Sequence, residues 1–78
     1  MASVSGRIVL VQEDRFQFTS DANQDQLFVL SHRASASAAD LRAWERAGRH
    51  VTVSYEPADG LIAAVARRVA PTKISSSA

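Results

Sequence analysis

Two segments of the chain alternate strictly between apolar and polar residues. In residues 15–19, Phe16 and Phe18 occupy one face and polar side chains occupy the other. Residues 50–56 repeat the pattern, with two valines and Tyr55 on one face. A period of two residues is typical of a strand that buries one face and exposes the other. Both segments are therefore predicted to be half-buried β-strands.

Three further segments, residues 8–11, 26–30 and 61–69, carry apolar residues on both faces. The first is rich in β-branched residues, which indicates a strand that is covered on both sides or that curls to serve two sheets. Gly6, just before it, is a candidate for a β-bulge. The facing of all three strands stays open. The last, residues 61–69, is rich in Ala, whose small side chain lets another element approach closely. Polar turn sequences separate the strands at residues 12–14, 21–25 and 57–60.

The middle of the chain has helical spacing. Residues 37–40 have the S-x-x-D form of a capping box, and Leu41 and Trp44 follow on one helical face. Gly48 is a typical stop signal. The predicted helix, residues 38–47, is too short to be stable alone, so we expect it to dock its two apolar side chains into the strands.

The expected fold class is all-β, with the element order β-β-β-α-β-β. Five short strands with a helix between the third and fourth is the order of the OB-fold, a small, partly open barrel with one end plugged by the helix. Three segments carry the resemblance, residues 6–9, 15–18 and 47–56. The last resembles the G-x-x-V-x-V-x-Y stretch of small uncharacterised bacterial OB-like proteins. It is also similar to the G-x-x-V-T-V strand of bacterial translation initiation factor one and related S1-type domains.

The resemblance covers about residues 5–69 and implies a small five-stranded OB-like barrel. An SH3-like barrel is the alternative, although it normally lacks a capped helix between its third and fourth strands. The length of 78 residues allows one small domain, which we place at residues 3–70, followed by a flexible Ser-rich tail at residues 71–78.

Composition narrows the classes of function. The sequence has no cysteine, which excludes a disulfide scaffold and a zinc–thiolate site. Its first residues lack the basic and apolar regions of a secretory signal, and its apolar runs are too short to span a membrane. We therefore expect a cytoplasmic protein with no membrane partner.

Residues suited to catalysis are sparse. His32 and His50 lie far apart in the sequence, the three glycines are isolated, and most carboxylates fall in predicted turns. Metal sites and activated nucleophiles need neighbouring partners, and phosphate loops need clustered glycines. We expect both histidines to be solvated and the protein to be no enzyme, with no cofactor and no metal.

Single-stranded RNA or DNA is one candidate ligand, because OB domains usually bind it on the face of strands two and three. The candidate contacts on that face are Arg15, Gln17 and Phe28, with Phe28 expected to be an exposed aromatic. Arg67 and Arg68 form a second, less conventional candidate. Against this hypothesis, the net charge is only +1 and the loops beside the face are acidic.

The favoured hypothesis is a non-enzymatic OB-like interaction module that binds a protein partner or itself. A partly open barrel leaves strand edges that pair with other chains. The Ala-rich residues 63–66 are suited to close packing against a second subunit. Binding of single-stranded nucleic acid is the alternative.

Overall fold

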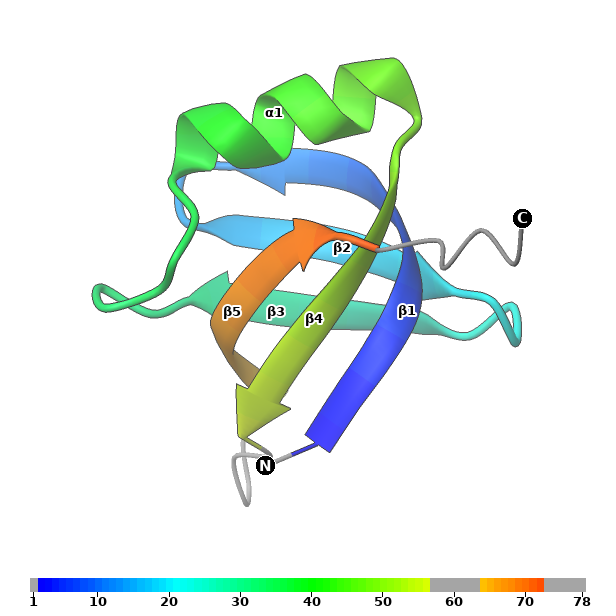
Figure 1. The fold of residues 1–78 in the computed structure, drawn as a ribbon, viewed down its shortest axis with the longest axis horizontal. Helices are drawn as coiled ribbons and strands as arrows, with labels where there is room; N and C mark the ends of the chain where they lie inside the picture. The colour runs from blue at the N-terminus through cyan, green and yellow to red at the C-terminus, as the bar shows by residue number, and fades with distance from the viewer. Residues whose placement is uncertain (1, 57–63, 73–78) are drawn as a thin grey trace, which may run out of the picture.

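The fold is described from a computed structural model of residues 2–56 and 64–72 (Figure 1). Most of these residues are in β-strands, and a helix lies between the third and fourth strands. In chain order the elements are β1 (Ala2–Gln12), β2 (Arg15–Ser20), β3 (Asp25–Leu30), α1 (Ala38–Ala47), β4 (His50–Glu56) and β5 (Ala64–Pro71).

The strands close into a barrel in the order β1-β2-β3-β5-β4. β1 pairs antiparallel with both β2 and β4, and the pairs β2–β3 and β4–β5 are also antiparallel. β3 and β5 pair in parallel and complete the barrel. The all-β fold class, the predicted element order and the OB-like barrel are confirmed.

β1 is long and curled, so that it takes part in two sides of the barrel. Its residues 2–7 pair with β4, and its residues 6–12 pair with β2. A side chain at Gly6 would overlap the carbonyl oxygen of Thr19 on β2. Glycine therefore allows the close backbone approach at the point where β1 passes from one partner to the other. The sequence left two interpretations of this apolar strand, one covered on both sides and one that curls to serve two sheets. The curled strand is confirmed.

A β-bulge lies at Val9, and the prediction of a bulge at Gly6 is wrong. The register with β2 is regular up to Ile8 and resumes at Leu10, which leaves Val9 as an extra residue. Ile8 is buried and Val11 packs against the core. Val9 and Leu10 are 54% and 42% exposed. The extra residue thus turns two successive aliphatic side chains toward solvent.

The core is built around the ring of Phe28 on β3. Phe28 is fully buried, and its ring centroid lies 5.4 Å from that of Phe16 and 5.8 Å from that of Phe18. The ring of Tyr55 on β4 lies 5.1 Å away. The predicted burial of Phe16 and Phe18 is confirmed. β3, whose facing the sequence left open, turns Phe28 and Leu30 into the barrel.

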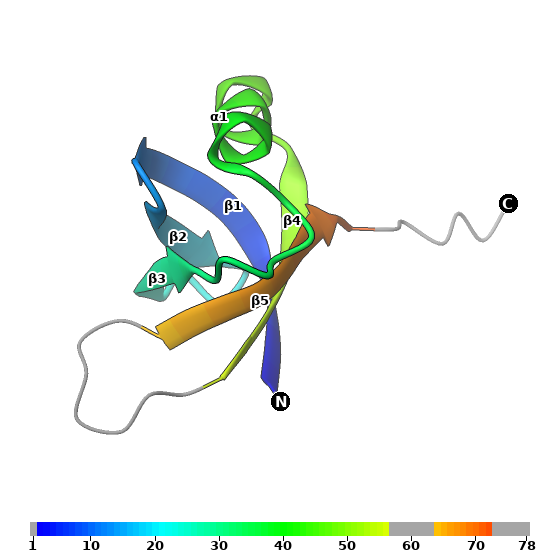
Figure 2. The same ribbon diagram turned by 90° about the vertical axis from the view of Figure 1, so that its left-hand side faces the viewer.

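α1 begins and ends where the sequence predicts. The Ser37 side chain accepts a hydrogen bond from the Asp40 N–H, and the Asp40 carboxylate accepts one from the Ser37 N–H. Gly48 has a left-handed conformation with φ of 62° and ends the helix. Leu41 is fully buried and Trp44 packs half-buried against the core. α1 therefore covers one end of the barrel beside β1 (Figure 1, Figure 2), and its predicted docking is confirmed.

β5 turns its alanines inward and its arginines outward. Ala64 and Ala66 are buried opposite β3. In the pairing with β4, Arg67 is an extra residue between Ala66 and Arg68, and both arginines are exposed. The arginines therefore lie on the outside of the barrel.

The barrel continues past the predicted domain boundary at residue 70. Pro71 is the last residue of β5. The Thr72 N–H donates to the His50 carbonyl oxygen at 2.9 Å, and the Thr72 hydroxyl lies 2.8 Å from Thr52 Oγ1. These contacts tie the chain to β4. The predicted turn at residues 57–60, residues 61–63 of the predicted last strand, and the tail from residue 73 lie outside the described residues.

Candidate functional site

Arg15 and Gln17 point outward from β2. Both side chains are exposed, whereas Phe16 and Phe18, which alternate with them, are buried. Because β2 pairs with β1 on one side and with β3 on the other, the residues of the three strands lie in three rows across the sheet. We call the outer surface formed by these rows the outer sheet face. The rows are Gln12–Arg15–Val29, Leu10–Gln17–Leu27 and Arg7–Thr19–Asp25.

Aliphatic side chains surround Gln17 in the outer sheet face. Leu10 is exposed, and Leu27 and Val29 are half-buried. Val9, at the bulge, extends the apolar surface along β1. Among the described residues, Val9 and Leu10 are the exposed large hydrophobic side chains. Exposed aliphatic side chains gathered among polar neighbours are typical of a surface that binds a partner.

Two shallow hollows lie on either side of the pair formed by Gln17 and Leu27. The first has a volume of about 150 Å³ and includes Arg15. The second has a volume of about 210 Å³ and includes Asp25. Both are smaller than the roughly 300–1,000 Å³ of sites that enclose small-molecule ligands, so they suit single side chains of a larger partner. The lining residues are Leu10, Gln12, Arg15, Phe16, Gln17 and Leu27 in the first, and Gln17, Asp25, Gln26 and Leu27 in the second.

The two hollows carry opposite charges. Arg15 is the charged residue that lines the first, and the ion pairs found among the described residues lie elsewhere. Asp25 is the charged residue that lines the second, and its Oδ1 accepts a hydrogen bond of 2.8 Å from Thr19 Oγ1. The first hollow is thus cationic and the second anionic, with Gln17 and Leu27 shared between them.

The prediction that Phe28 is an exposed aromatic on this face is wrong. Phe28 lies opposite Phe16 and in phase with Leu30, so it belongs to the inner face of β3. Both faces of β3 are apolar, and alternation therefore could not distinguish inside from outside. All five aromatic residues of the sequence lie within the described residues, and each packs in or against the core. In the described part of the chain, the outer sheet face presents no aromatic ring on which a base could stack.

Arg67 and Arg68 are not part of the outer sheet face. Arg67 Nη2 donates to Glu56 Oε2 at 3.0 Å, and both side chains are exposed. Arg68 lies opposite Ser54 on β4. Because β3 separates β5 from β2, these arginines occupy a different side of the barrel from the two β2 candidates. The structure brings Arg15 and Gln17 together but leaves Arg67 and Arg68 apart from them.

Sequence reasoning missed a polar contact between β4 and the loop before β3. His50 Nε2 lies 2.9 Å from both carboxylate oxygens of Asp21. The Asp21 N–H donates to the Ser5 carbonyl oxygen at 3.0 Å, which ties the same loop to β1. His50 and Asp21 are 29 positions apart, and no local pattern relates them. His50 is therefore partly solvated and also joined to Asp21, a contact that the sequence did not predict, whereas His32 is exposed as predicted.

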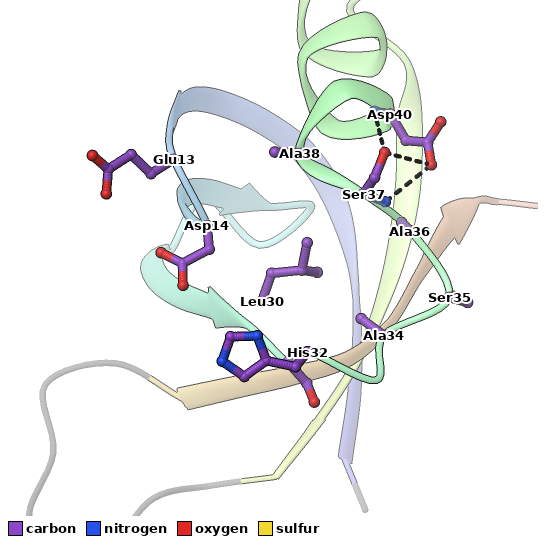
Figure 3. A pocket seen from close by; sticks show the side chains of 11 residues that line it. Glu13, Asp14, Leu30, His32, Ala34, Ser35, Ala36, Ser37, Ala38 and Asp40 are labelled. Atoms are coloured by element: carbon purple, nitrogen blue, oxygen red, sulfur yellow. Dashed lines mark hydrogen bonds between the residues drawn. The ribbon is translucent and has the colours of Figure 1, made fainter.

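A larger cleft lies where the turn between β1 and β2 faces the start of α1 (Figure 3). Its volume is about 500 Å³. Glu13, Asp14 and His32 stand at its edge, while Asp40 is engaged in the helix cap with Ser37. Within residues 2–56 and 64–72, no three His, Asp or Glu side chains gather as metal ligands would. The cleft combines acidic side chains with the small residues of the loop before α1.

A closed five-stranded barrel with a capped helix between its third and fourth strands defines an OB-like β-barrel protein. No protein-family model and no curated protein matches the chain. The resemblance to bacterial OB-like proteins and to translation initiation factor one is thus supported at the level of the barrel and not at the level of a family. In the part of the chain that the structure describes, no helix is long and apolar enough to cross a membrane.

Proposed function

We propose that the protein is a non-enzymatic binding module that holds a segment of another protein on its outer sheet face. The observation that carries this proposal is the bulge at Val9, which exposes Val9 and Leu10 beside Leu27 and Val29. Bulges often redirect side chains next to functional sites. Covering this aliphatic surface with a partner removes it from water, which favours association.

The chemistry of the face favours protein over single-stranded nucleic acid. Proteins that bind single strands without sequence preference combine a basic groove with aromatic rings that stack on bases. In this barrel the aromatic rings pack in or against the core. Exposed Glu13 and Asp14 lie in the turn next to Arg15, and Asp25 lies at the other end of the face. A phosphate backbone along the face would therefore run from Arg15 toward the carboxylate of Asp25, while Glu13 and Asp14 line the cleft beside α1.

The closed barrel also argues against the mode of self-association that the sequence suggested. Within the described residues each strand pairs with two others over at least part of its length, so no strand presents a whole open edge. Ala64 and Ala66 lie inside the barrel and offer no surface to a second subunit, and Ala63 lies outside the described residues. The outer sheet face is thus the better supported interaction surface.

The proposal is tested by selecting a random peptide library, displayed on phage, on the immobilised protein. Leu27→Asp places a charge inside the aliphatic surface and is expected to weaken the selected peptides by about ten-fold or more, because the charge is buried without a partner on binding. Ser3→Asp is the matched control, since Ser3 is exposed on β1 opposite Ser54 of β4, outside the outer sheet face. Equal effects of both substitutions would contradict the proposal, as would unchanged binding to Leu27→Asp.

Titration with mixed-sequence single-stranded RNA and DNA tests the alternative. If nucleic acid is the ligand, binding should fall steeply with added salt, and Arg15→Ala should weaken it. Absent or salt-insensitive binding would agree with a protein partner.

A further inference from the structure

We infer that the outer sheet face binds an extended peptide in which an acidic, an aliphatic and a basic side chain occupy alternate positions. This inference rests on the proposed function and adds the chemical class of the partner. It follows from the spacing of the three rows, from the opposite charges of the two hollows and from two glutamines that line the hollows.

The rows of the outer sheet face have the side-chain spacing of a strand. Arg15, Gln17 and Thr19 are alternate residues of β2, so neighbouring rows lie about 7 Å apart, twice the rise per strand residue. An extended peptide laid along β2 turns every second side chain toward the sheet at the same spacing. Its side chains at positions i, i+2 and i+4 can therefore each meet one row.

The charges of the two hollows determine which side chains these are, since Arg15 lines the first and Asp25 lines the second, while Arg7 of the last row lines neither. Arg15 in the first row forms no ion pair with a described carboxylate, so it suits an acidic side chain. Leu10 and Leu27 in the middle row suit an aliphatic side chain. Asp25 in the last row is hydrogen-bonded by Thr19 through Oδ1, and it suits a basic side chain. The ends of this arrangement are four residues of β2 apart, about 14 Å, which matches positions i and i+4 of an extended peptide.

Two glutamines suit the backbone of such a peptide. Gln12 and Gln17 are exposed and line the first hollow, and Gln17 also lines the second. A carboxamide both donates and accepts hydrogen bonds, as a peptide group does. The glutamines can therefore bond to N–H and C=O groups of the peptide between its anchoring side chains.

The test compares random peptide libraries selected on the unmodified protein and on Arg15→Glu. The unmodified protein is expected to enrich peptides with an acidic residue two positions from an aliphatic residue and four positions from a basic one. Arg15→Glu is expected to enrich a basic residue in place of the acidic one. A peptide selected on the unmodified protein should bind Arg15→Glu about ten-fold more weakly, and exchange of its acidic residue for lysine should restore the affinity.

A second peptide separates the extended conformation from a helical one, because opposite charges four positions apart also share one face of a helix. This peptide carries proline between its acidic and aliphatic residues. Proline is compatible with an extended chain and breaks a helix. Retained binding supports the inference. Binding that is lost with this proline and also with a proline placed instead between the aliphatic and basic residues overturns it, because each proline removes only one of the N–H groups that the glutamines can bond.

The outcomes distinguish this inference from the proposed function. Peptides that lose binding to Leu27→Asp but show no charge order would overturn the inference and leave the proposed function standing. Peptides unaffected by Leu27→Asp, or no enrichment at all, would overturn both. Sedimentation that shows a concentration-dependent mass abolished by Leu10→Asp would make a second copy of the chain the occupant and overturn the peptide assignment. Salt-sensitive binding of single strands that is lost in Arg15→Glu would overturn it in favour of nucleic acid.

Discussion

Replacement of Phe28 by alanine tests the core of the barrel most directly. The Phe28 side chain is fully buried, and its ring centroid lies 5.1–5.8 Å from those of three other aromatic residues. Truncation of a buried phenylalanine costs about 3–5 kcal/mol. At about 0.05–0.15 kcal/mol per residue, a chain of 78 residues has a free energy of unfolding of about 4–12 kcal/mol. Phe28→Ala is therefore expected to remove at least a quarter of the stability, and nearly all of it if the total is small.

Urea unfolding followed by the fluorescence of Trp44 measures this loss. Trp44 is the only tryptophan in the sequence and packs half-buried against the core, so its surroundings change when the barrel opens. Phe28→Leu retains most of the apolar volume and is expected to cost about 1–2 kcal/mol. Gln17→Ala, on the outer sheet face, is expected to change the free energy of unfolding by less than about 0.5 kcal/mol.

A Phe28→Ala variant as stable as Gln17→Ala would refute the burial of Phe28. That result would place the ring on the outer surface of β3 and restore base stacking as a role for this strand. If Phe28→Ala does not fold, Phe28→Leu decides the question. A cost for Phe28→Leu no larger than that of Gln17→Ala would contradict the core described above.

Three local features lead to further predictions, each measured by the same urea unfolding. Gly6→Ala is expected to lower the free energy of unfolding by about 3 kcal/mol or more, the upper end of the range typical of overpacking. The reason is that a Cβ there would lie 2.7 Å from the backbone of Ser20. Normal stability would contradict the close approach of β1 to β2. Gly48→Ala is expected to lower the free energy of unfolding by about 1–2 kcal/mol, because a φ of 62° strains alanine. No atom lies within 4 Å of a Cβ at this position, so no steric cost is added. A loss as large as that of Gly6→Ala would contradict the open surroundings. Ser37→Ala is expected to cost about 0.5–2 kcal/mol through loss of the cap, whereas Ser35→Ala, exposed outside the cap, should be nearly neutral; equal values would contradict the capping box.

Much of the candidate site was predictable because alternation is a local property. The outward direction of Arg15 and Gln17 follows from the period of two in β2, where only one face is apolar. The same reasoning failed for Phe28, since both faces of β3 are apolar and the period carries no direction. The hollows and their opposite charges depend on residues from three strands, and no single segment of sequence contains them.

The sequence by itself determined the type and order of the elements of this protein, although β1 begins at Ala2 and not at the predicted residue 8. The capping box and the stop glycine of α1, and the alternation of β2 and β4, act between residues a few positions apart, so a linear pattern contains them. Only the tertiary structure decided the bulge at Val9, the inward facing of β3 and the contact of His50 with Asp21. Each of these depends on how one strand or loop lies against another that is distant in the chain. The register and packing energies that select such arrangements exist only once the barrel has closed.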